Sequence, residues 1–491
     1  MKPLKLLDIL NKLSMKKGKE SLLKELKMSF TDVADFNVNE IGETPDYGKV
    51  YICYLSTLVN AERVHFLMQN SNQGLLNSDF HSFSGIEFSV KSNPSESVQA
   101  ILKGNAIICS TLSVDGIAFD IGESKNRSVD LPQSENVIRG PMNAFIEDYS
   151  TNLSLIRQRI HSQDLKVWEI NIGKIANVKV GVLYLSTIAN DNLIKKVKKE
   201  LEKIDTDGLQ DVGQIRELMT NKKGLNIFPM MFGTERPDRV AASLLDGRVI
   251  IMMNGTPFTL IAPTVFIDFW HSTEDYYLPP IIATFMRSLR FIALAISVFL
   301  PGIYVALASV NTESNRLEIA LSIAGSREGV PYPVLIETIA MLLIMDLVVE
   351  AGVRLPKTIG PTATMVGGVV LGQAVVEANI VSNLVVIITA TTAISNFIVV
   401  DYHMGLVHRM MKYMIVLFAS VFGLLGLVIS FTLMVTYLSQ LESFGTPYLS
   451  PIGPYTKGDI INVIFRPPLK WVKKPGKILH SKNTRRSSND K

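Results

Sequence analysis

The sequence FIALAISVFLPGIYVALA spans residues 291–308 and begins a series of five long apolar runs that decides the fold. A bilayer core about 30 Å thick needs about 20 mostly apolar residues in one helix, and three of the runs reach that length with their flanks. Several helices in series that are apolar on every side are typical of membrane proteins. Residues 281–440 are therefore predicted to form a polytopic α-helical membrane domain. The other runs are VLIETIAMLLIMDLVV (334–349), MVGGVVLGQAVV (365–376), LVVIITATTAISNFIVV (384–400) and MIVLFASVFGLLGLVISFTLMVTYL (414–438).

The first 280 residues differ in composition from this apolar part and are predicted to be soluble α/β protein. They carry most of the acidic residues, whereas charges become sparse after Arg290. The first twenty residues, MKPLKLLDILNKLSMKKGKE, contain neither a long apolar region nor a small-residue cleavage site, which argues against a signal peptide. We interpret residues 1–44 as a basic amphipathic segment and expect the soluble part to stay in the cytoplasm.

Two pairs of similar stretches in the soluble part predict a duplication. The strand VYICYLSTLVN (50–60) recurs as VGVLYLSTIAN (180–190), and SVQAILKGNAII (97–108) resembles VAASLLDGRVII (240–251). In the second pair, a short helix passes through a glycine turn into a β-branched strand. An Asp-Gly or Asn-Gly turn into a further strand follows in both copies, which is a strong hairpin signal. We therefore expect two tandem α/β lobes. Their predicted bounds are 45–137 and 166–280.

The segment between the lobes, residues 138–165, is dense in charge. Pro141 interrupts the chain, and Thr151 or Asn152 can cap the helix that follows it. Its charged side chains form either a ligand-binding cluster or a salt-bridged connector that holds the lobes together, and we favour the connector. They are Arg139, Glu147, Asp148, Arg157 and Arg159.

Three carboxylates interrupt the second apolar run: Glu337, Asp346 and Glu350. A charge at the middle of a bilayer costs about 3 kcal/mol, so these groups must face protein or water. On a helix, Asp346 and Glu350 share one face and Glu337 lies nearly opposite. Two interpretations stay open. Either the carboxylates belong to a channel or relay, or Glu350 lies at the interface near Arg354 and Lys357 and only one carboxylate is deep.

The fourth run carries a narrow polar stripe of Ser382, Thr389, Thr392 and Asn396. Such a stripe either makes hydrogen bonds between helices or lines a wetted surface. We expect the first in a monomer, whereas in a symmetric ring the repeated stripe would line a pore.

The third run contains Gly368 and Gly372 in GxxxG spacing. Small residues at this spacing let helix backbones approach closely, so we expect these glycines to serve helix packing.

Basic residues flank the apolar runs and are expected on the cytoplasmic side of the membrane. Five crossings would place the basic tail, residues 441–491, outside; we therefore expect an even number, most simply four, with 359–380 as the segment that does not cross. The tail can attract anionic lipid headgroups. Nucleic-acid binding is the alternative for such a cluster, but no nucleic-acid-binding fold accompanies it. The flanking residues are Arg287, Arg290, Arg354, Lys357, Arg409 and Lys412.

Catalytic and metal-binding patterns are absent from the sequence. It has no P-loop, no GxSxG and no HExxH, and its seven histidines are scattered. Its two cysteines, Cys53 and Cys109, lie in apolar strand-like runs without metal-ligand spacing. We therefore predict a protein that is not an enzyme and that needs neither a cofactor nor a metal.

Several long motifs, in the same order along nearly the whole chain, closely resemble the A-type subunit of the GerA family of spore germinant receptors. The first 40 residues and the tail beyond about Thr456 match only in character. The motifs include RGPMNAFIEDYSTNLSLIRQR (139–159), ERPDRV (235–240), REGVPYP (327–333), EAGVRLP (350–356), GGVVLGQAVVEANIVS (367–382) and FGTPYLSP (444–451).

The resemblance implies a multi-pass subunit of the spore inner membrane, with its N-terminal domain and tail facing the spore core. It implies two partners, a transporter-like B-type subunit that binds the nutrient and a C-type lipoprotein. It also implies a homo-oligomeric ring, a pentamer, that forms a nutrient-gated cation channel and triggers germination. The family supplies no list of pore residues, so Glu337, Asp346, Thr389, Thr392 and Asn396 are our own candidates. The alternatives are a non-conducting signalling scaffold for the B-type subunit and, with less support, a transporter, for which no convincing repeat is found within residues 281–440.

Overall fold

The structure of the chain, a computed structural model, describes most of its residues. They form two compact units. The first comprises Met1–Lys222, Met231–Pro263 and Lys473–Lys491, and the second comprises Lys223–Met230 and Thr264–Val472. The described residues are 21–44, 48–76, 86–123, 132–135, 137–220, 226–314, 316–356, 360–455, 459–468 and 482.

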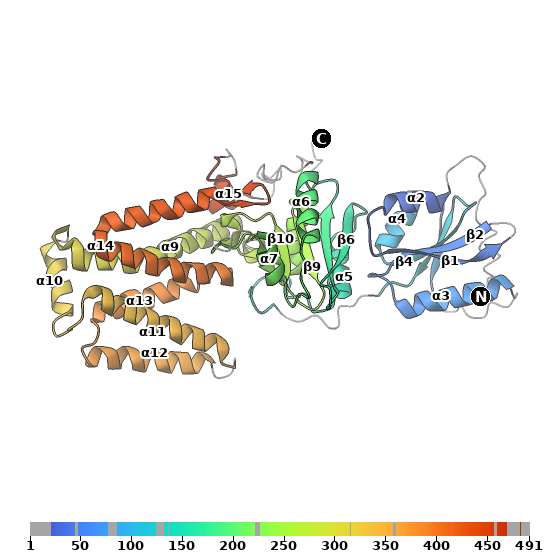
Figure 1. Cartoon of the computed structure of the whole chain (residues 1–491). Coiled ribbons are helices and arrows are strands. Elements are labelled where there is room, and N and C mark those ends of the chain that lie inside the picture. The colour runs from blue at the N-terminus through green and yellow to red at the C-terminus, as the bar shows by residue number, and fades with distance from the viewer. Residues whose placement is uncertain are drawn as a thin grey trace. The chain divides into compact units, whose positions relative to one another are not determined.

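The first lobe of the soluble unit is a five-stranded antiparallel sheet in the order β1-β2-β4-β5-β3. Helices α2 and α4 cover one face and α3 covers the other (Figure 1). Successive residues of a strand point to opposite faces, so Ile52 packs beneath α3 while Cys53 packs beneath α2 and α4. The elements are α2 (Leu22–Ser29), β1 (Phe36–Thr44), β2 (Gly48–Leu55), α3 (Ala61–Leu76), β3 (Phe88–Lys91), α4 (Pro94–Leu102), β4 (Asn105–Ser110) and β5 (Gly116–Asp120).

The second lobe repeats this architecture, with strand order β6-β7-β9-β10-β8. Each strand occupies the place of its counterpart in the first lobe, which agrees with the predicted duplication. The elements are α5 (Tyr149–Arg159), β6 (Leu165–Ile172), β7 (Val178–Leu185), α6 (Asp191–Glu202), α7 (Val212–Thr220), β8 (Phe232–Thr234), α8 (Pro237–Leu245), β9 (Val249–Met253) and β10 (Thr259–Ala262).

The glycine turns of the repeat have the same backbone conformation in both lobes. Gly104 follows α4 and Gly247 follows α8, and each has a φ of +91°. This left-handed region favours glycine because a Cβ would be strained there. A Cβ on Gly104 would also lie 3.0 Å from the carbonyl oxygen of Leu58. The turns therefore require glycine for a conformational reason.

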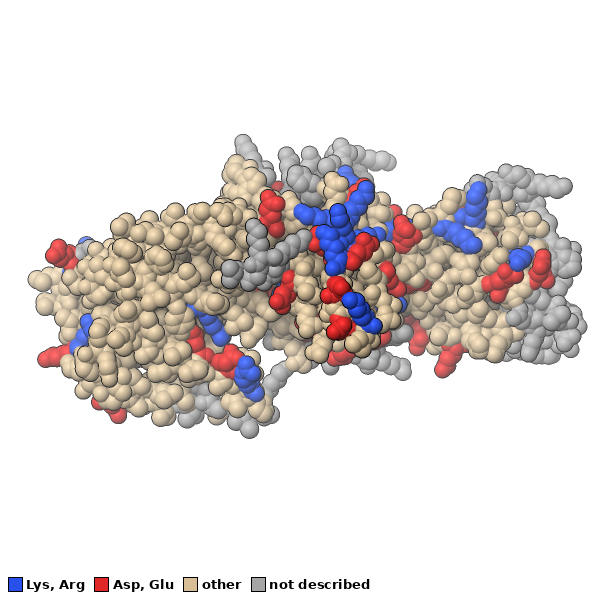
Figure 2. All heavy atoms as spheres, in the orientation of Figure 1, with Lys and Arg blue, Asp and Glu red and all other residues tan. Residues whose placement is uncertain are grey.

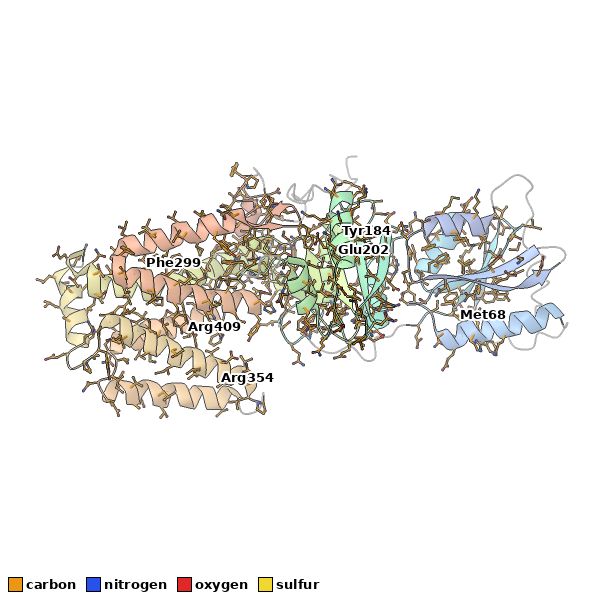
Figure 3. The ribbon with its side chains drawn as sticks, in the orientation of Figure 1. Met68, Tyr184, Glu202, Phe299, Arg354 and Arg409 are labelled. Carbon is orange, nitrogen blue, oxygen red and sulfur yellow. The ribbon has the colours of Figure 1, made fainter. Side chains whose placement is uncertain are left out.

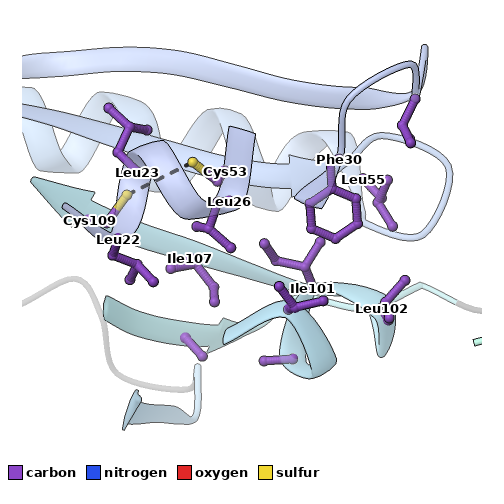
Figure 4. Packing of buried hydrophobic residues seen from close by; sticks show 14 of the residues in the cluster. Leu22, Leu23, Leu26, Phe30, Cys53, Leu55, Ile101, Leu102, Ile107 and Cys109 are labelled. Carbon is purple, nitrogen blue, oxygen red and sulfur yellow. Dashed lines mark hydrogen bonds between the residues drawn. The ribbon is translucent and has the colours of Figure 1, made fainter. Parts of the chain in front are cut away.

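The core beneath α2 and α4 contains both cysteines of the chain. Cys53 on β2 and Cys109 on β4 are fully buried, with their sulfur atoms 3.9 Å apart (Figure 4). They are free thiols that pack as small apolar side chains, as the sequence predicts.

The first lobe begins before the predicted boundary at residue 45. Leu22, Leu23 and Leu26 of α2 are buried in its core, and β1 is a strand of its sheet. Residues 21–44 are therefore part of the lobe, because their apolar face packs on the sheet. The remainder of the predicted basic segment, residues 1–20, lies outside the described residues.

The helical unit contains the five apolar runs, and charged side chains are sparse on its visible face (Figure 2). Its elements are α9 (Pro280–Val305), α10 (Leu317–Ser326), α11 (Val334–Arg354), α12 (Gly360–Glu377), α13 (Asn383–Asn396), α14 (Tyr402–Gln440) and α15 (Ile461–Ile464). A short hairpin, β11 (Glu442–Ser443) and β12 (Thr446–Pro447), follows α14, and short helical turns lie at Phe266–Phe269, Thr273–Tyr276, Ala306–Val310 and Thr312–Ser314.

Helix α14 is a helical hairpin, whereas the sequence predicts one continuous span over 414–438. Gly423 breaks the helix with φ 60° and ψ −137°. The arms then run back along each other, so that a Cβ on Gly426 would lie 2.1 Å from the carbonyl oxygen of Phe418. Asn311 stabilises the break because its Oδ1 accepts a hydrogen bond from the Leu424 N–H at 2.8 Å. The arms are visible in Figure 1, where the ribbon reverses at the α14 label.

Two segments of the described chain are long and apolar enough to cross a membrane: Pro280–Val310 and Tyr402–Gln440. Helix α13 has 14 residues and is therefore shorter than the apolar run 384–400. Its length is about 21 Å, which is less than the bilayer core of about 30 Å. The four-crossing topology therefore stays a prediction, and the break at Gly423 divides the last apolar run into two arms.

Replacing Gly423 by alanine should have opposite effects on stability in a broken and in a continuous α14. At Gly423, alanine would occupy a backbone region open to glycine, and its Cβ would lie 1.9 Å from Asn311 Oδ1. We expect Gly423→Ala to lower the free energy of unfolding by about 1–3 kcal/mol. Thermal unfolding of the purified full chain in detergent measures this change.

Gly405→Ala is the matched control, because Gly405 lies within the first arm and a Cβ there would meet nothing within 4 Å. Alanine should stabilise that position by up to about 1 kcal/mol. A stabilising Gly423→Ala variant would mean that α14 is continuous.

Candidate functional site

The polar groups inside the apolar helices form the candidate site, and its centre is an ion pair between α11 and α14. Lys412 Nζ lies 2.8 Å from Asp346 Oδ1, and the Tyr413 hydroxyl donates to Asp346 Oδ2 at 2.6 Å. The Lys412 side chain is 5% exposed and that of Asp346 is 20% exposed. A buried charge without a partner is strongly destabilising, so this pair fixes α11 against α14.

The second carboxylate of α11, Glu337, is buried and bound by different groups. The Ser382 hydroxyl donates to its Oε1 at 2.5 Å, and Arg327 Nε lies 3.4 Å from its Oε2. Ser382 also caps the start of α13, because its Oγ accepts from the Val385 N–H. Glu337 therefore joins the N-terminal ends of α11 and α13.

The third carboxylate, Glu350, lies nearer the surface. Arg354 Nη2 is 2.7 Å from its Oε1, and Arg409 Nη1 is 4.0 Å from its Oε2. Figure 3 labels both arginines at the same end of the helical bundle. Glu350 thus pairs with Arg354, and its place at a membrane interface stays a prediction; Lys357 lies outside the described residues.

The polar stripe of α13 faces the interior of the chain. Thr389 and Thr392 are buried. Their hydroxyls donate to the carbonyl oxygens of Val385 and Ile388, each four residues earlier in the same helix. The Asn396 Oδ1 is buried and has no hydrogen-bond partner among the described residues. Within one chain α13 packs chiefly against α9. A role in lining a pore therefore stays a prediction about the assembled protein.

The two packing glycines of α12 differ in their surroundings. A Cβ on Gly372 would lie 4.0 Å from Val386 of α13, whereas a Cβ on Gly368 would meet nothing within 4 Å. Among the described residues, Gly372 therefore lies just within van der Waals distance of a neighbouring helix. A packing role for Gly368 stays a prediction.

A buried charge cluster connects the start of α9 to the C-terminal segment. Asp275 is fully buried between Arg287 Nε at 3.0 Å and Arg290 Nη2 at 2.8 Å. Burial alone would raise the pKa of Asp275, but the hydrogen bonds and charges of Arg290 and Arg287 outweigh it and hold that pKa below its usual value. Arg287 also donates to the carbonyl oxygen of Asn462 at 3.0 Å, so the cluster holds the segment around α15 in place.

A histidine completes this attachment. His271 Nε2 lies 2.8 Å from the carbonyl oxygen of Val463. Burial, with the nearby charge of Arg287, lowers the pKa of His271 to about 4.

The predicted connector between the lobes is held by one of its charged residues above all. Arg157 and Asp35 form an ion pair of 2.7 Å, with side chains 1% and 3% exposed, and Arg157 also donates to the carbonyl oxygen of Leu165. Asp148 has a local role, because it caps α5 by accepting from the Thr151 N–H. Arg139 and Glu147 lie exposed on the same segment.

The main residues that the sequence analysis missed are partners of predicted ones. From the sequence, Lys412 is expected only as a flanking cytoplasmic charge, although a lysine at the edge of an apolar run is a possible partner for Asp346. Arg327 and Asp275 carry no local signal, because their partners lie 10 or more residues away in the sequence. Among the described residues, no group of three or more His, Cys, Asp or Glu side chains could hold a metal ion.

Comparison with known proteins agrees with the sequence motifs. The family model described as Bacillus/Clostridium GerA spore germination protein matches residues 24–477. The chain is 38% identical over 392 residues to spore germination protein B1 of Bacillus subtilis (strain 168), covering 80% of this chain and 81% of that protein. It is 33% identical over 472 residues to spore germination protein GerLA of Bacillus cereus, covering 94% and 96%.

Two further similarities concern a membrane protein and a solved structure. The chain is 33% identical over 430 residues to the uncharacterized membrane protein YfkQ of Bacillus subtilis (strain 168), covering 85% of this chain and 83% of that protein. The crystal structure of the N-terminal domain of the A subunit of the Bacillus megaterium spore germinant receptor GerK3 is 25% identical. The match between the two covers 50% of this chain and 94% of the GerK3 domain, with a TM-score of 0.37.

The ion pair between α11 and α14 predicts a non-additive double mutant. Asp346→Asn leaves Lys412 charged and unpaired, so it should lower the free energy of unfolding by about 3–5 kcal/mol. Asp346→Asn combined with Lys412→Met should recover most of that loss. Glu350→Gln is the control and should change stability by less than about 1 kcal/mol, because Arg354 is 76% exposed. Equal losses of unfolding free energy in Asp346→Asn and Glu350→Gln would mean that the Asp346–Lys412 pair does not fix α11 against α14.

The lowered pKa of His271 predicts an acid-sensitive attachment. In the unfolded chain His271 has a pKa near 6.5, whereas in the folded chain its pKa is about 4. Between these two pH values the unfolded state therefore binds a proton that the folded state does not bind. Stability is therefore fully present above about pH 6.5 and falls as the pH drops toward 4. Replacement by a neutral amide, His271→Gln, should flatten this part of the stability–pH curve, measured by thermal unfolding at stepped pH. An unchanged slope would assign the acid sensitivity to other groups.

Proposed function

The chain belongs to the Bacillus/Clostridium GerA spore germination protein family, and we propose that it is the A-type subunit of a nutrient-responsive germinant receptor that conducts cations. Its relatives carry names of spore germination proteins, and one is named as a membrane protein. Membrane association fits the two long apolar segments, Pro280–Val310 and Tyr402–Gln440. The activity proposed is receptor signalling and ion passage, without catalysis.

The observation that carries the proposal is the Asp346–Lys412 pair inside an apolar bundle. We take the paired arrangement as the closed state, in which Lys412 neutralises the carboxylate. Separation of α11 from α14 would expose Asp346 to water, where a carboxylate attracts cations. Moving an equilibrium from 1:99 to 99:1 takes about 5.5 kcal/mol, so nutrient binding to the partner would have to favour the separated state by that amount.

The proposed path is shared by several copies, five in our proposal, around a common axis. Thr389, Thr392 and Asn396 would line it once α13 separates from α9, and Glu337 would attract cations toward one end. Asn396 supports this because its buried Oδ1 has no described partner, so a wetted state would satisfy it.

The partners in this proposal are a transporter-like B-type subunit that binds the nutrient and a C-type lipoprotein. The assembly would lie in the spore inner membrane, with the soluble lobes and the tail in the spore core. Nutrient binding to the B-type subunit would shift the equilibrium between paired and separated helices, and cations would leave the core as the first step of germination.

The second candidate function is a non-conducting scaffold that docks the B-type subunit. One observation favours it: the hydroxyls of Thr389 and Thr392 are buried and already bonded within their own helix. The full chain, reconstituted with its B-type and C-type partners in liposomes with a cation-sensitive dye, distinguishes the two functions, because a conducting subunit passes cations when nutrient binds. A scaffold gives no flux with or without its partners.

Asn396 provides the sharpest test of the path. Asn396→Leu has nearly the same size and removes a buried oxygen without a described partner. If the side chain lines the path, the variant should lower cation flux in liposomes at least tenfold, because a leucine constriction expels water. Thr391→Leu is the control, because Thr391 is more exposed than the buried Thr392 beside it and bonds only to Ile387 within its own helix.

A dry Asn396 gives a different result. Its loss should then raise the free energy of unfolding by about 1–3 kcal/mol and leave flux unchanged. Unchanged flux in Asn396→Leu would remove the α13 stripe from the path.

A further inference from the structure

The α14 hairpin encloses a cavity of about 260 Å³ between its two arms. Met411, Met414 and Phe418 line it from the first arm, and Leu433 and Met434 line it from the second. Phe228, from the segment that precedes β8, closes one side. The cavity is separate from the Asp346–Lys412 pair and is not used in the proposed conduction.

The lining selects an apolar ligand, because its two hydroxyls are already engaged. Ser430 Oγ donates to the carbonyl oxygen of Leu427 at 2.9 Å, and the Tyr437 hydroxyl donates to Asn226 Oδ1 at 3.2 Å. An apolar cavity of about 150 Å³ stays dry and binds benzene or xenon, so this larger one has room for several methylene groups. Methionine side chains are flexible and adapt to an irregular apolar chain.

The mouth of the cavity identifies the source of that ligand. Met414 and Leu433 line the cavity and are 50% and 54% exposed, so the opening lies on the outer surface of the hairpin. That surface continues with exposed apolar side chains such as Leu417 and Leu425. In the membrane location proposed above, the mouth is in contact with lipid tails.

We propose that this cavity binds one acyl chain of a membrane lipid. The bound chain packs between the arms and against Phe228, whose ring lies 5.9 Å from that of Tyr437. Because the lipid contacts both arms and residues 227–228, its occupancy stabilises the hairpin together with this segment. The site is independent of whether the protein conducts ions, although it rests on the membrane location.

Photolabelling of the full chain tests the site directly. The protein is reconstituted in phosphatidylglycerol vesicles that contain phosphatidylglycerol with a mid-chain diazirine, illuminated, and digested for mass spectrometry. We expect adducts on the buried lining residue Met411 and on the half-buried lining residue Met434, in addition to any on the outward-facing Leu425 and Val428. Adducts on the outward-facing residues alone would overturn the proposal.

Variants that fill the cavity sharpen this test. Ser430→Phe and Met434→Trp should each lower adducts at Met411 at least fivefold. Val428→Phe should leave them unchanged, because Val428 lies on the same arm, is 61% exposed and does not line the cavity. Retained labelling of Met411 in a filling variant with a wild-type melting curve would overturn the site.

The source of the chain is tested by a parallel arm with a short diazirine-bearing hydrocarbon added from the water phase. Labelling of Met411 by the lipid, with or without the hydrocarbon, supports the acyl-chain site. Labelling by the hydrocarbon alone would overturn the lipid as occupant, since the site would then take a free small molecule.

Discussion

The ion pair between Asp346 and Lys412 is the interaction on which the packing of the apolar helices depends. The interior of an apolar helix bundle offers little water to satisfy a charge, so a carboxylate there requires a partner on a neighbouring helix. Helix α11 meets this requirement on two faces, since Asp346 binds α14 and Glu337 binds Ser382 at the start of α13. Its orientation between these two helices is thereby fixed by charge as well as by shape.

The same constraint explains the form of α14. A break in a helix frees backbone groups, and in an apolar environment each of them needs a substitute partner. Asn311 supplies one to Leu424, and Asn311 directly follows the widened turn at Ala306–Val310 that ends α9. Gly302 of α9 packs against Ile415 of the first arm and Leu427 of the second, so no larger residue fits there without displacement. The break in α14 and the end of α9 therefore depend on each other.

The soluble lobes could be predicted from sequence more fully than the helical unit. Gly104 and Gly247 each follow an amphipathic helix, and this local pattern places the turn and the hairpin of each lobe. The apolar runs reveal where helices lie, but Gly423 looks like an ordinary residue of a continuous span. What makes it a break is Asn311, which is 113 residues away from Leu424, and sequence periodicity carries no signal for such a contact. The Lys412–Asp346 pair, across 66 residues, was missed for the same reason.

The chain passes between its two units more than once, and this connectivity has a mechanical consequence. Residues 223–230 belong to the helical unit, although the residues on both sides of them belong to the soluble unit. They are held there by the Ser443 hydroxyl, which donates to the carbonyl oxygen of Met230 at 2.7 Å, and by the Tyr448 hydroxyl, which donates to that of Pro229 at 2.9 Å. Met230 lies two residues before the start of β8 at Phe232, which is an edge strand of the second lobe. The segment is therefore tied to the hairpin that follows α14 by hydrogen bonds and to that strand by the backbone.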